Sequence, residues 1–458
     1  MMQLLIAISL LILQFIAGFG VLCLLKIYLK PGLFISLSVL IGVAVFSFVP
    51  FALQLAYITL TAFNVFAALI AVSFLLNLKS KNGFVYLVQS LRSYRFQWRL
   101  YEIPSLLLIL FMVFVSVWRC YYYPPTPRDL TSGAEVIAEY AVKEKTMINS
   151  VFTVDLSTTN NQFKPPFLTC LQIIYKYAGF PFGQVWLSGV FIFFTFFLYS
   201  ALNEKLHKII TGLLLVMFIA IPEMYGYTIM ALFDYSNAVF FCLSVYFLIE
   251  YFANGKSGYI ILSGVLMAIA VYVRSETLIL AGLVLPVILF HHWRKNNFSK
   301  FFKTAACFFL PSVLIYLLSI TIYINYYLPT LYKIDSLLNT NLANLNLFYQ
   351  RISDVAGKYL LAGNILDHYG YFTFIFVIVL CADAFRKNSW NQVSLNWLWA
   401  IFIIFIGISL IGFLFPLYDL DHSTKRGLLK IFPLMLLYMA NSGFLVSISE
   451  DIKKWERS

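Results

Sequence analysis

The stretch GYIILSGVLMAIAVYVRSETLILAGLVLPVILF, residues 258–290, consists of two apolar runs separated by Arg274, Ser275 and Glu276. Apolar runs cross hydrocarbon as helices, because an α-helix satisfies its own backbone hydrogen bonds where water is absent. The pattern recurs along all 458 residues, which are 61% hydrophobic and 11% charged with a mean hydropathy of +0.85. A water-soluble domain of this composition could not bury its apolar residues beneath a polar surface. The short alternating segments that are typical of a membrane barrel are missing from the sequence. The sequence therefore predicts an all-α polytopic membrane protein.

About thirteen apolar runs are predicted to cross the membrane, since a single helix needs roughly 20 residues to do so. Two segments between them, residues 120–182 and 328–369, are too long to be mere connections, and such segments often carry function. The predicted spans lie near residues 2–25, 31–51, 54–77, 103–119, 184–202, 209–222, 228–252, 258–273, 276–290, 304–327, 370–385, 393–417 and 428–447.

The basic residues predict which side of the membrane each loop faces. The loop from Lys79 to Glu102 carries five basic residues against one acid, and loops of this kind stay in the cytoplasm. Threading the spans from this loop places the N-terminus outside, the C-terminus in the cytoplasm and both long segments outside. The net charge of +12 is scattered over short loops, so we expect no nucleic-acid partner.

The first long outer segment contains a predicted surface helix. Ser132-Gly-Ala-Glu135 has the form of a capping box, in which the serine caps the helix and the glutamate reaches back to the cap. The sequence predicts an amphipathic helix over residues 131–145 that lies on the membrane surface. One face of this helix is formed by Ala134, Ile137, Tyr140 and Ala141.

Two residues of the same segment are candidates for chemistry. Asp129 lies between a proline-rich stretch and the predicted helix start, where a fixed carboxylate can act as a general base. It can equally pair with Arg128 or cap the helix. Lys164 precedes Pro165 and Pro166 where the chain returns to the membrane, so it is placed either to bind a lipid phosphate or to snorkel towards headgroups.

Charged residues also occur at the ends of predicted spans. Asp234 lies a few residues into the span near 228–252, and Arg274 and Glu276 lie where the span near 258–273 reaches the outer face. Charge beside hydrocarbon is costly, so three such groups at one level more often line a polar cavity than face lipid. Arg274 and Glu276 can also form a simple ion pair.

The last outer loop gathers several polar side chains. Asp419, Asp421 and His422 are ligand types that bind divalent metals, but their loose spacing fits a solvated turn as well. Lys425 and Arg426 follow them, just before the last predicted span.

Taken in order, these segments resemble the GT-C superfamily of polytopic glycosyltransferases, in particular the branch that includes the lipid A aminoarabinose transferase and the protein mannosyltransferases. Arg128-Asp129-Leu resembles the acidic start of the family's first outer loop, and Lys164-Pro-Pro-Phe resembles its return into the membrane. The other matching segments are Phe233-Asp234-Tyr-Ser, which resembles an Ala-Asp-Leu-Pro span, Val273-Arg274-Ser-Glu276, which resembles an Arg/Lys-x-Glu turn, and Lys425-Arg426-Gly-Leu-Leu-Lys430-Ile-Phe-Pro433, which resembles an Arg-Tyr-Leu-Leu-Pro-x-x-Pro segment. Lys430 stands where the family commonly has proline.

The resemblance covers residues 101–458. It implies a GT-C-like catalytic transmembrane domain over this range, with outer loops 120–182 and 328–369. Residues 1–100 are left as an extra N-terminal unit of three spans and a basic cytoplasmic loop.

By this resemblance, the chain moves a sugar from a polyprenyl-phosphate donor to a cell-envelope glycan or lipid acceptor, with inversion at the anomeric carbon. The implied place of the reaction is the extracytoplasmic face of a bacterial inner membrane, whose lipid surrounds the chain. Asp129 is the implied general base, and a divalent cofactor, Mg²⁺ or Mn²⁺, stays open. The implied ligands of the donor phosphate are Lys164, Arg274 and Arg426, and the implied cavity contacts to acceptor or metal are Asp234, Glu276, Asp421 and His422.

Two other functions stay open at this point. An O-antigen polymerase or ligase also uses polyprenyl-linked sugar donors and large outer loops, and the length of the product separates it from a single-sugar transferase. A membrane transporter would use Asp234, Arg274 and Glu276 to gate a solute path. The sequence shows neither an obvious inverted repeat nor paired interrupted spans, which are typical of transporters.

Overall fold

The computed structural model describes residues 2–93, 99–125, 133–152, 164–230, 232–294, 298–328, 345–361, 369–386, 390–415 and 420–456. Within these ranges the regular structure is entirely helical, with no strand, as the sequence predicts.

The helices of the N-terminal half follow the predicted spans within a few residues at most ends. They are α1 (Met2–Leu24), α2 (Pro31–Leu55), α3 (Ala62–Asn77), α4 (Lys81–Ser93), η1 (Leu100–Glu102), α5 (Ile103–Tyr122), α7 (Ala134–Glu144), η2 (Ser150–Phe152), α8 (Phe167–Tyr177), α9 (Val185–Asn203), α10 (Lys208–Ile219) and α11 (Pro222–Gly226).

The C-terminal half continues in the same way and includes helical fragments in the second long segment, residues 328–369. Its elements are α12 (Phe233–Asn254), α13 (Ser257–Val273), α14 (Thr277–Arg294), α15 (Phe298–Tyr316), η3 (Leu317–Tyr327), α16 (Leu345–Val355), η5 (Ala356–Leu361), α18 (Phe372–Phe385), α19 (Gln392–Leu414), η6 (Leu420–Thr424), α20 (Lys425–Gly427), η7 (Leu428–Lys430), α21 (Ile431–Ala440) and α22 (Gly443–Trp455).

In the described ranges, seven helices are long and apolar enough to cross a membrane, and the number is nine if each of two bent pairs is one span. The bent pairs are α3 with α4, at 82°, and residues 422–440 with α22, at 51°. Four shorter apolar helices accompany them: residues 208–219, 257–273, 277–293 and 372–385. Several long apolar helices support the prediction of an integral membrane protein.

Local sequence signals set several helix ends. Thr61 caps α3 by accepting a hydrogen bond from the backbone N–H of Asn64 at 3.2 Å. Ser442 caps α22 in the same way, accepting from Leu445 at 3.3 Å. The cap at Ser442 starts a new helix, which explains why the predicted span 428–447 is divided into two helices that meet at an angle.

Helices α1 and α2 lie very close together because glycines face the backbone of the opposite helix. A Cβ atom at Gly18 would lie 1.8 Å from the carbonyl oxygen of Ser38, and one at Gly42 would lie 1.8 Å from that of Gln14. Membrane helices use such small residues because van der Waals packing, rather than removal from water, drives their association. Helix α2 also packs against α8 and α9, so the N-terminal helices share a core with the rest of the chain.

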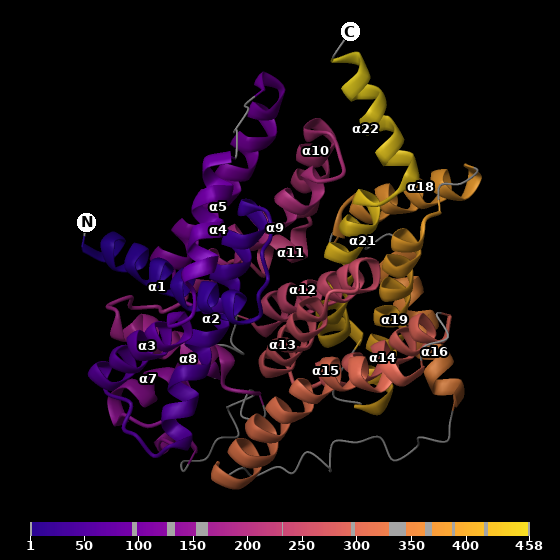
Figure 1. Cartoon of the computed structure of the whole chain (residues 1–458). Helices are drawn as coiled ribbons and strands as arrows, with labels where there is room; N and C mark the ends of the chain where they lie inside the picture. Colours follow the sequence, from indigo (N-terminus) through magenta and orange to yellow (C-terminus); the bar gives the residue numbers. More distant parts are fainter. Residues whose placement is uncertain are drawn as a thin grey trace.

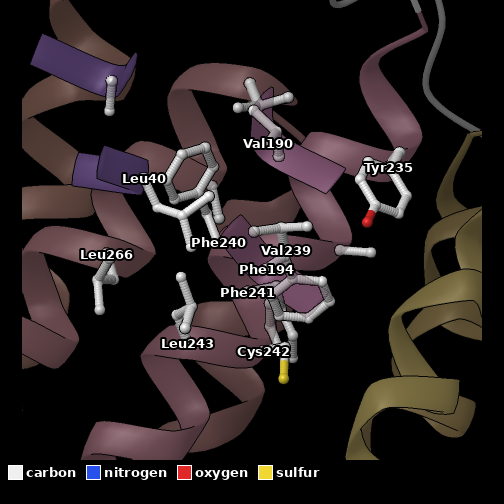
Figure 2. Close-up of a cluster of buried hydrophobic side chains, with 14 of the residues drawn as sticks. Leu40, Val190, Phe194, Tyr235, Val239, Phe240, Phe241, Cys242, Leu243 and Leu266 are labelled. Atoms are coloured by element: carbon white, nitrogen blue, oxygen red, sulfur yellow. The ribbon is translucent and has the colours of Figure 1, made fainter. Parts of the chain in front are cut away.

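Helix α12 lies at the centre of the fold, between the N-terminal helices and the C-terminal ones (Figure 1). Figure 2 shows its side chains gathered with Leu40 of α2, Val190 and Phe194 of α9, and Leu266 of α13. All four of these partners are fully buried. Because α12 is buried along most of its length, the residues at its N-terminal end are held in fixed positions relative to α13 and α21.

Helix α7 differs from the predicted surface helix in its contacts. It covers residues 134–144, and its buried face packs on α8 rather than lying free on the membrane surface. Tyr140 is 39% exposed and does not belong to this face, since it points about 110° away from it around the helix axis. The carboxylate of Glu135 does not reach back to a cap, because it pairs with Lys176 at 2.5 Å and accepts from Gln172 at 2.8 Å. Ser132 lies outside the described residues.

Candidate functional site

Ion pairs join the start of α12 to the turn after α13. The Nη1 atom of Arg274 donates to Asp234, and its Nε atom donates to Glu276 at 2.5 Å. The side chains of Asp234 and Arg274 are only 3% and 6% exposed, and that of Glu276 is 17% exposed. Three residues that the sequence placed at one level therefore form one cluster, which includes the ion pair between Arg274 and Glu276.

The positions of these charges follow from where the helices begin and end. Asp234 lies in the first turn of α12, and Arg274 caps the C-terminal end of α13. The helix macrodipole favours an acid at the start of a helix, as at Asp234, and a base at the end of a helix, as at Arg274. One turn into α12, the buried amide of Asn237 donates to the carbonyl oxygen of Ala270 at 2.6 Å and to Thr277 Oγ1 at 2.9 Å. These hydrogen bonds hold α12 against both α13 and α14, the helices on either side of the turn.

Lys164 lies beside this cluster. Its Nζ atom is 3.9 Å from Glu276 Oε1 and 5.7 Å from the centre of the Phe233 ring. The prolines that follow it, Pro165 and Pro166, are buried, so the backbone behind the lysine is held rigidly. The side chain itself is 26% exposed, so these neighbours cover it only in part.

The neighbouring cations keep Glu276 ionised. Burial alone would raise its pKa, but the charges of Arg274 and Lys164 outweigh this effect and lower the pKa of Glu276 to about 2. Burial and the positive charge of Arg274 lower the pKa of Lys164. A nearby anion would relieve the repulsion between these two cations.

A small pocket lies between Lys164 and the start of α7. Its wall includes Ala134 and Ile137 of α7 together with Lys164 and Tyr323. The start of α7 therefore lies next to the charged cluster, as expected if both outer-segment motifs belong to one site.

The short helix α20, which precedes η7 and α21, also lies near the charged cluster. The charge of Arg426 acts on both Tyr227 and Lys164. Its neighbour Lys425 pairs with Glu223 of α11 at 2.5 Å. The structure thus brings together Lys164, Arg274 and Arg426, the three cations predicted to bind a donor phosphate.

Lys430, a further cation, was missed as a site residue by sequence reasoning. It is the last residue of η7, which packs against α12, and it is only 3% exposed. The available signal was a single lysine within the apolar run 428–433, where a charge is costly. The charges that act on Lys430 are those of Arg274, Asp234, Glu276 and Lys164.

Among the described residues, the site holds more positive than negative charge. The cations are Lys164, Arg274, Lys425, Arg426 and Lys430, and the carboxylates are Asp234, Glu276 and Glu223. An excess of positive charge in a partly buried site favours an anionic ligand such as phosphate.

Other predicted residues are not placed in this cluster. Asp129 lies outside the described residues, as does the side chain of Asp421, and His422 is exposed in η6. No group of three or more possible metal-ligating side chains occurs in the part of the chain that the structure describes. Asp234 and Glu276 are both paired with a guanidinium, an arrangement that does not fit a divalent cation between them.

An apolar groove of about 700 Å³ is lined by α1, α2, α3, α13 and α15. Tyr272, two residues before Arg274, forms part of its wall. The ring of Tyr272 packs against Phe51, and Phe51 packs in turn against Tyr323 of the small pocket beside Lys164. Packed aromatic rings, Tyr272, Phe51 and Tyr323, therefore lie between the apolar groove and the small pocket beside Lys164.

A scan against models of protein families, a search of curated proteins and a search of solved structures each found no significant match to this chain.

Proposed function

We propose that this chain is a membrane glycosyltransferase that moves a sugar from a polyprenyl-phosphate donor to a cell-envelope glycan or lipid on the extracytoplasmic face of a bacterial inner membrane. The observation that carries the proposal is the cation-rich cluster around Arg274 beside an apolar groove of about 700 Å³. A lipid-linked phosphate calls for both features, because its phosphate is bound by cations and its chain by apolar surface.

A GT-C-like arrangement of thirteen crossings is part of this proposal. Nine spans together with the four shorter apolar helices give that number, and the basic loop 79–102 sets the cytoplasmic side. In this orientation the ends of α12 and α13 that carry Asp234 and Arg274 face the outside.

In the proposed reaction, an acceptor hydroxyl attacks the anomeric carbon while the lipid phosphate leaves from the opposite side. Asp129 takes the hydroxyl proton, and Lys164 and Arg426 stabilise the charge that develops on the phosphate. Ala134, five residues after Asp129, lines the pocket beside Lys164, and five residues reach at most about 18 Å. Chain length therefore permits Asp129 to act at this site.

Arg274 has a distinct part in this proposal. Its guanidinium is engaged by Asp234 and Glu276, so much of its charge is already balanced. We expect Arg274 to hold the cluster in shape and to contact the donor phosphate at one edge. Lys164, which is less tightly paired, contributes more of the binding free energy.

The proposal is tested by incubating the purified protein with radiolabelled undecaprenyl-phosphate sugars and envelope acceptors and measuring which donor is consumed. Asp129→Asn should leave expression and folding intact and reduce transfer at least about 100-fold, because general base catalysis contributes about this much. Full transfer activity in this variant would eliminate Asp129 as the base.

The same assay separates the related alternative. One added sugar per acceptor supports the proposed transferase, whereas a ladder of products or the transfer of a preassembled block supports an O-antigen polymerase or ligase. Both would use the cation cluster for a polyprenyl-linked donor, so product length decides between them.

A further inference from the structure

Lys430 is a buried cation for which the described residues supply no paired counter-ion. It is 3% exposed, and within the described residues its ammonium group makes no hydrogen bond and no ion pair. A buried ammonium is costly unless an opposite charge or several acceptors compensate it. The chain accepts this cost in the middle of an otherwise apolar run, which indicates a ligand that supplies the missing negative charge.

The described carboxylates that act on Lys430 are already paired with other cations. Asp234 and Glu276 act on it electrostatically, but both pair with Arg274, and Glu276 also faces Lys164. Of the four described residues whose charges act on Lys430, two, Arg274 and Lys164, are cations that repel it. The position suits an anion that enters between Lys164 and Lys430, on the side of α12 where η7 packs.

We propose that Lys430 contacts the phosphate of the donor and stabilises it as a leaving group, an inference that rests on the proposed sugar transfer. In the reaction the bond between the anomeric carbon and the phosphate oxygen breaks, and its electron pair stays on that oxygen. A new bond forms between the anomeric carbon and the acceptor oxygen, whose proton passes to Asp129.

The charge on the phosphate changes during this step. A sugar phosphodiester carries one negative charge, and the released polyprenyl phosphate carries close to two at pH 7. A cation that the protein leaves unpaired therefore interacts more strongly with the leaving group than with the bound donor. Such differential binding lowers the barrier instead of merely tightening donor binding.

The test compares Lys430→Met, which keeps the length of the side chain without its charge, with Lys430→Arg, which keeps the charge. We expect Lys430→Met to lower kcat on the order of 100-fold with little change in the KM for the donor. Inhibition by added decaprenyl phosphate should weaken at least about tenfold. Lys430→Arg should retain most of both properties, and Lys208→Met, which removes a lysine paired with Glu102 outside the site, serves as the matched control.

The melting temperature of Lys430→Met distinguishes a role of Lys430 in phosphate binding from a purely structural role. Removing an unpaired buried charge should leave the melting temperature of the ligand-free protein unchanged or raise it, whereas removing a partner from a structural ion pair lowers it. A lower melting temperature for Lys430→Met, with inhibition by decaprenyl phosphate unchanged, would overturn the proposal.

A binding measurement distinguishes failure of this inference from failure of the proposed function. Decaprenyl phosphate should raise the melting temperature of the wild-type protein in detergent and should do so much less in Lys430→Met. This result, together with absence of sugar transfer from every donor, would leave the phosphate site in place and reject the transferase. Equal stabilisation of both proteins by decaprenyl phosphate would reject the role of Lys430 alone.

Discussion

At the residue scale, Arg274 determines the geometry of the cluster because one guanidinium serves two carboxylates on different elements. Asp234 belongs to α12 and Glu276 to the turn before α14, so their distance from each other is fixed through Arg274. The planar fork of arginine suits this double contact, and a lysine would not reproduce it.

The depressed pKa of Glu276 predicts how stability depends on pH. Since its pKa is about 2 in the folded protein and 4.5 ordinarily, its charge stabilises the fold at pH values above 4.5, and this contribution is lost as the pH falls from 4.5 towards 2. Glu276→Gln should therefore destabilise the protein by about 3 kcal/mol at pH 7 and approach the wild type near pH 2. Thermal unfolding of both proteins in detergent between pH 7 and pH 3 measures how their stabilities approach each other as the pH falls.

The matched control for this experiment is Glu139→Gln. Glu139 pairs with Lys143 on the surface of α7 at 2.8 Å, and its side chain is 49% exposed, so its loss should change stability little at any pH. Parallel pH curves for the wild type and Glu276→Gln would contradict the assigned state of Glu276.

Sequence reasoning could identify Asp234, Arg274 and Glu276 because isolated charges stand out in apolar runs. It could not show that one guanidinium joins both acids, since this depends on how α12 and α13 pack. Lys430 carried the same signal, but its neighbours in space come from distant parts of the chain. Asn237 gave no signal at all, because a single amide in a helix acquires its role only through the partners it meets.

At the scale of elements, the helix boundaries were largely predictable, whereas their partners were not. Runs of apolar residues locate α1, α2 and α12 within a few residues. The apolar face of α7 was visible in the sequence, but the sequence did not show that α8 covers it. An amphipathic pattern specifies that a face is apolar and leaves open whether lipid or protein contacts it.

The close contact between α1 and α2 yields a prediction at this scale. Gly42→Ala places a methyl group against the backbone of Gln14, so the helices must separate, and we expect a loss on the order of 2 kcal/mol in stability. Gly282→Ala in α14 is the control, because no atom lies within 4 Å of the added carbon and alanine favours the helix. The melting temperatures of both variants in detergent measure the difference, and a Gly42→Ala protein as stable as the control would contradict the packing.

At the scale of the whole molecule, the N-terminal helices form part of a groove that α13 and α15 complete. The resemblance to known glycosyltransferases begins only near residue 101, so these helices had no expected part in the site. The structure places α2 next to the proposed site, because the ring of its Phe51 packs against Tyr272 of the groove and Tyr323 of the pocket beside Lys164.

The proposed binding of the donor's lipid chain in this groove predicts that the KM for the donor depends on the length of that chain. Ala268→Trp fills part of the groove and should raise the KM for a donor with a chain of eleven isoprene units at least about tenfold, while a donor with two units is affected much less. Ile403→Trp is the matched control, since it fills a second apolar groove of about 430 Å³ between α14 and α19. An equal effect on both donors, or the same effect from the control, would contradict a role of the first groove in chain binding.

The apolar lining of the first groove also affects how the protein must be assayed. We expect an apolar ligand chain to enter this apolar groove from the lipid or detergent phase, because passage through water would expose the chain. Its relevant concentration is then the mole fraction in the lipid or detergent phase, and adding empty micelles at constant total ligand should slow turnover by surface dilution.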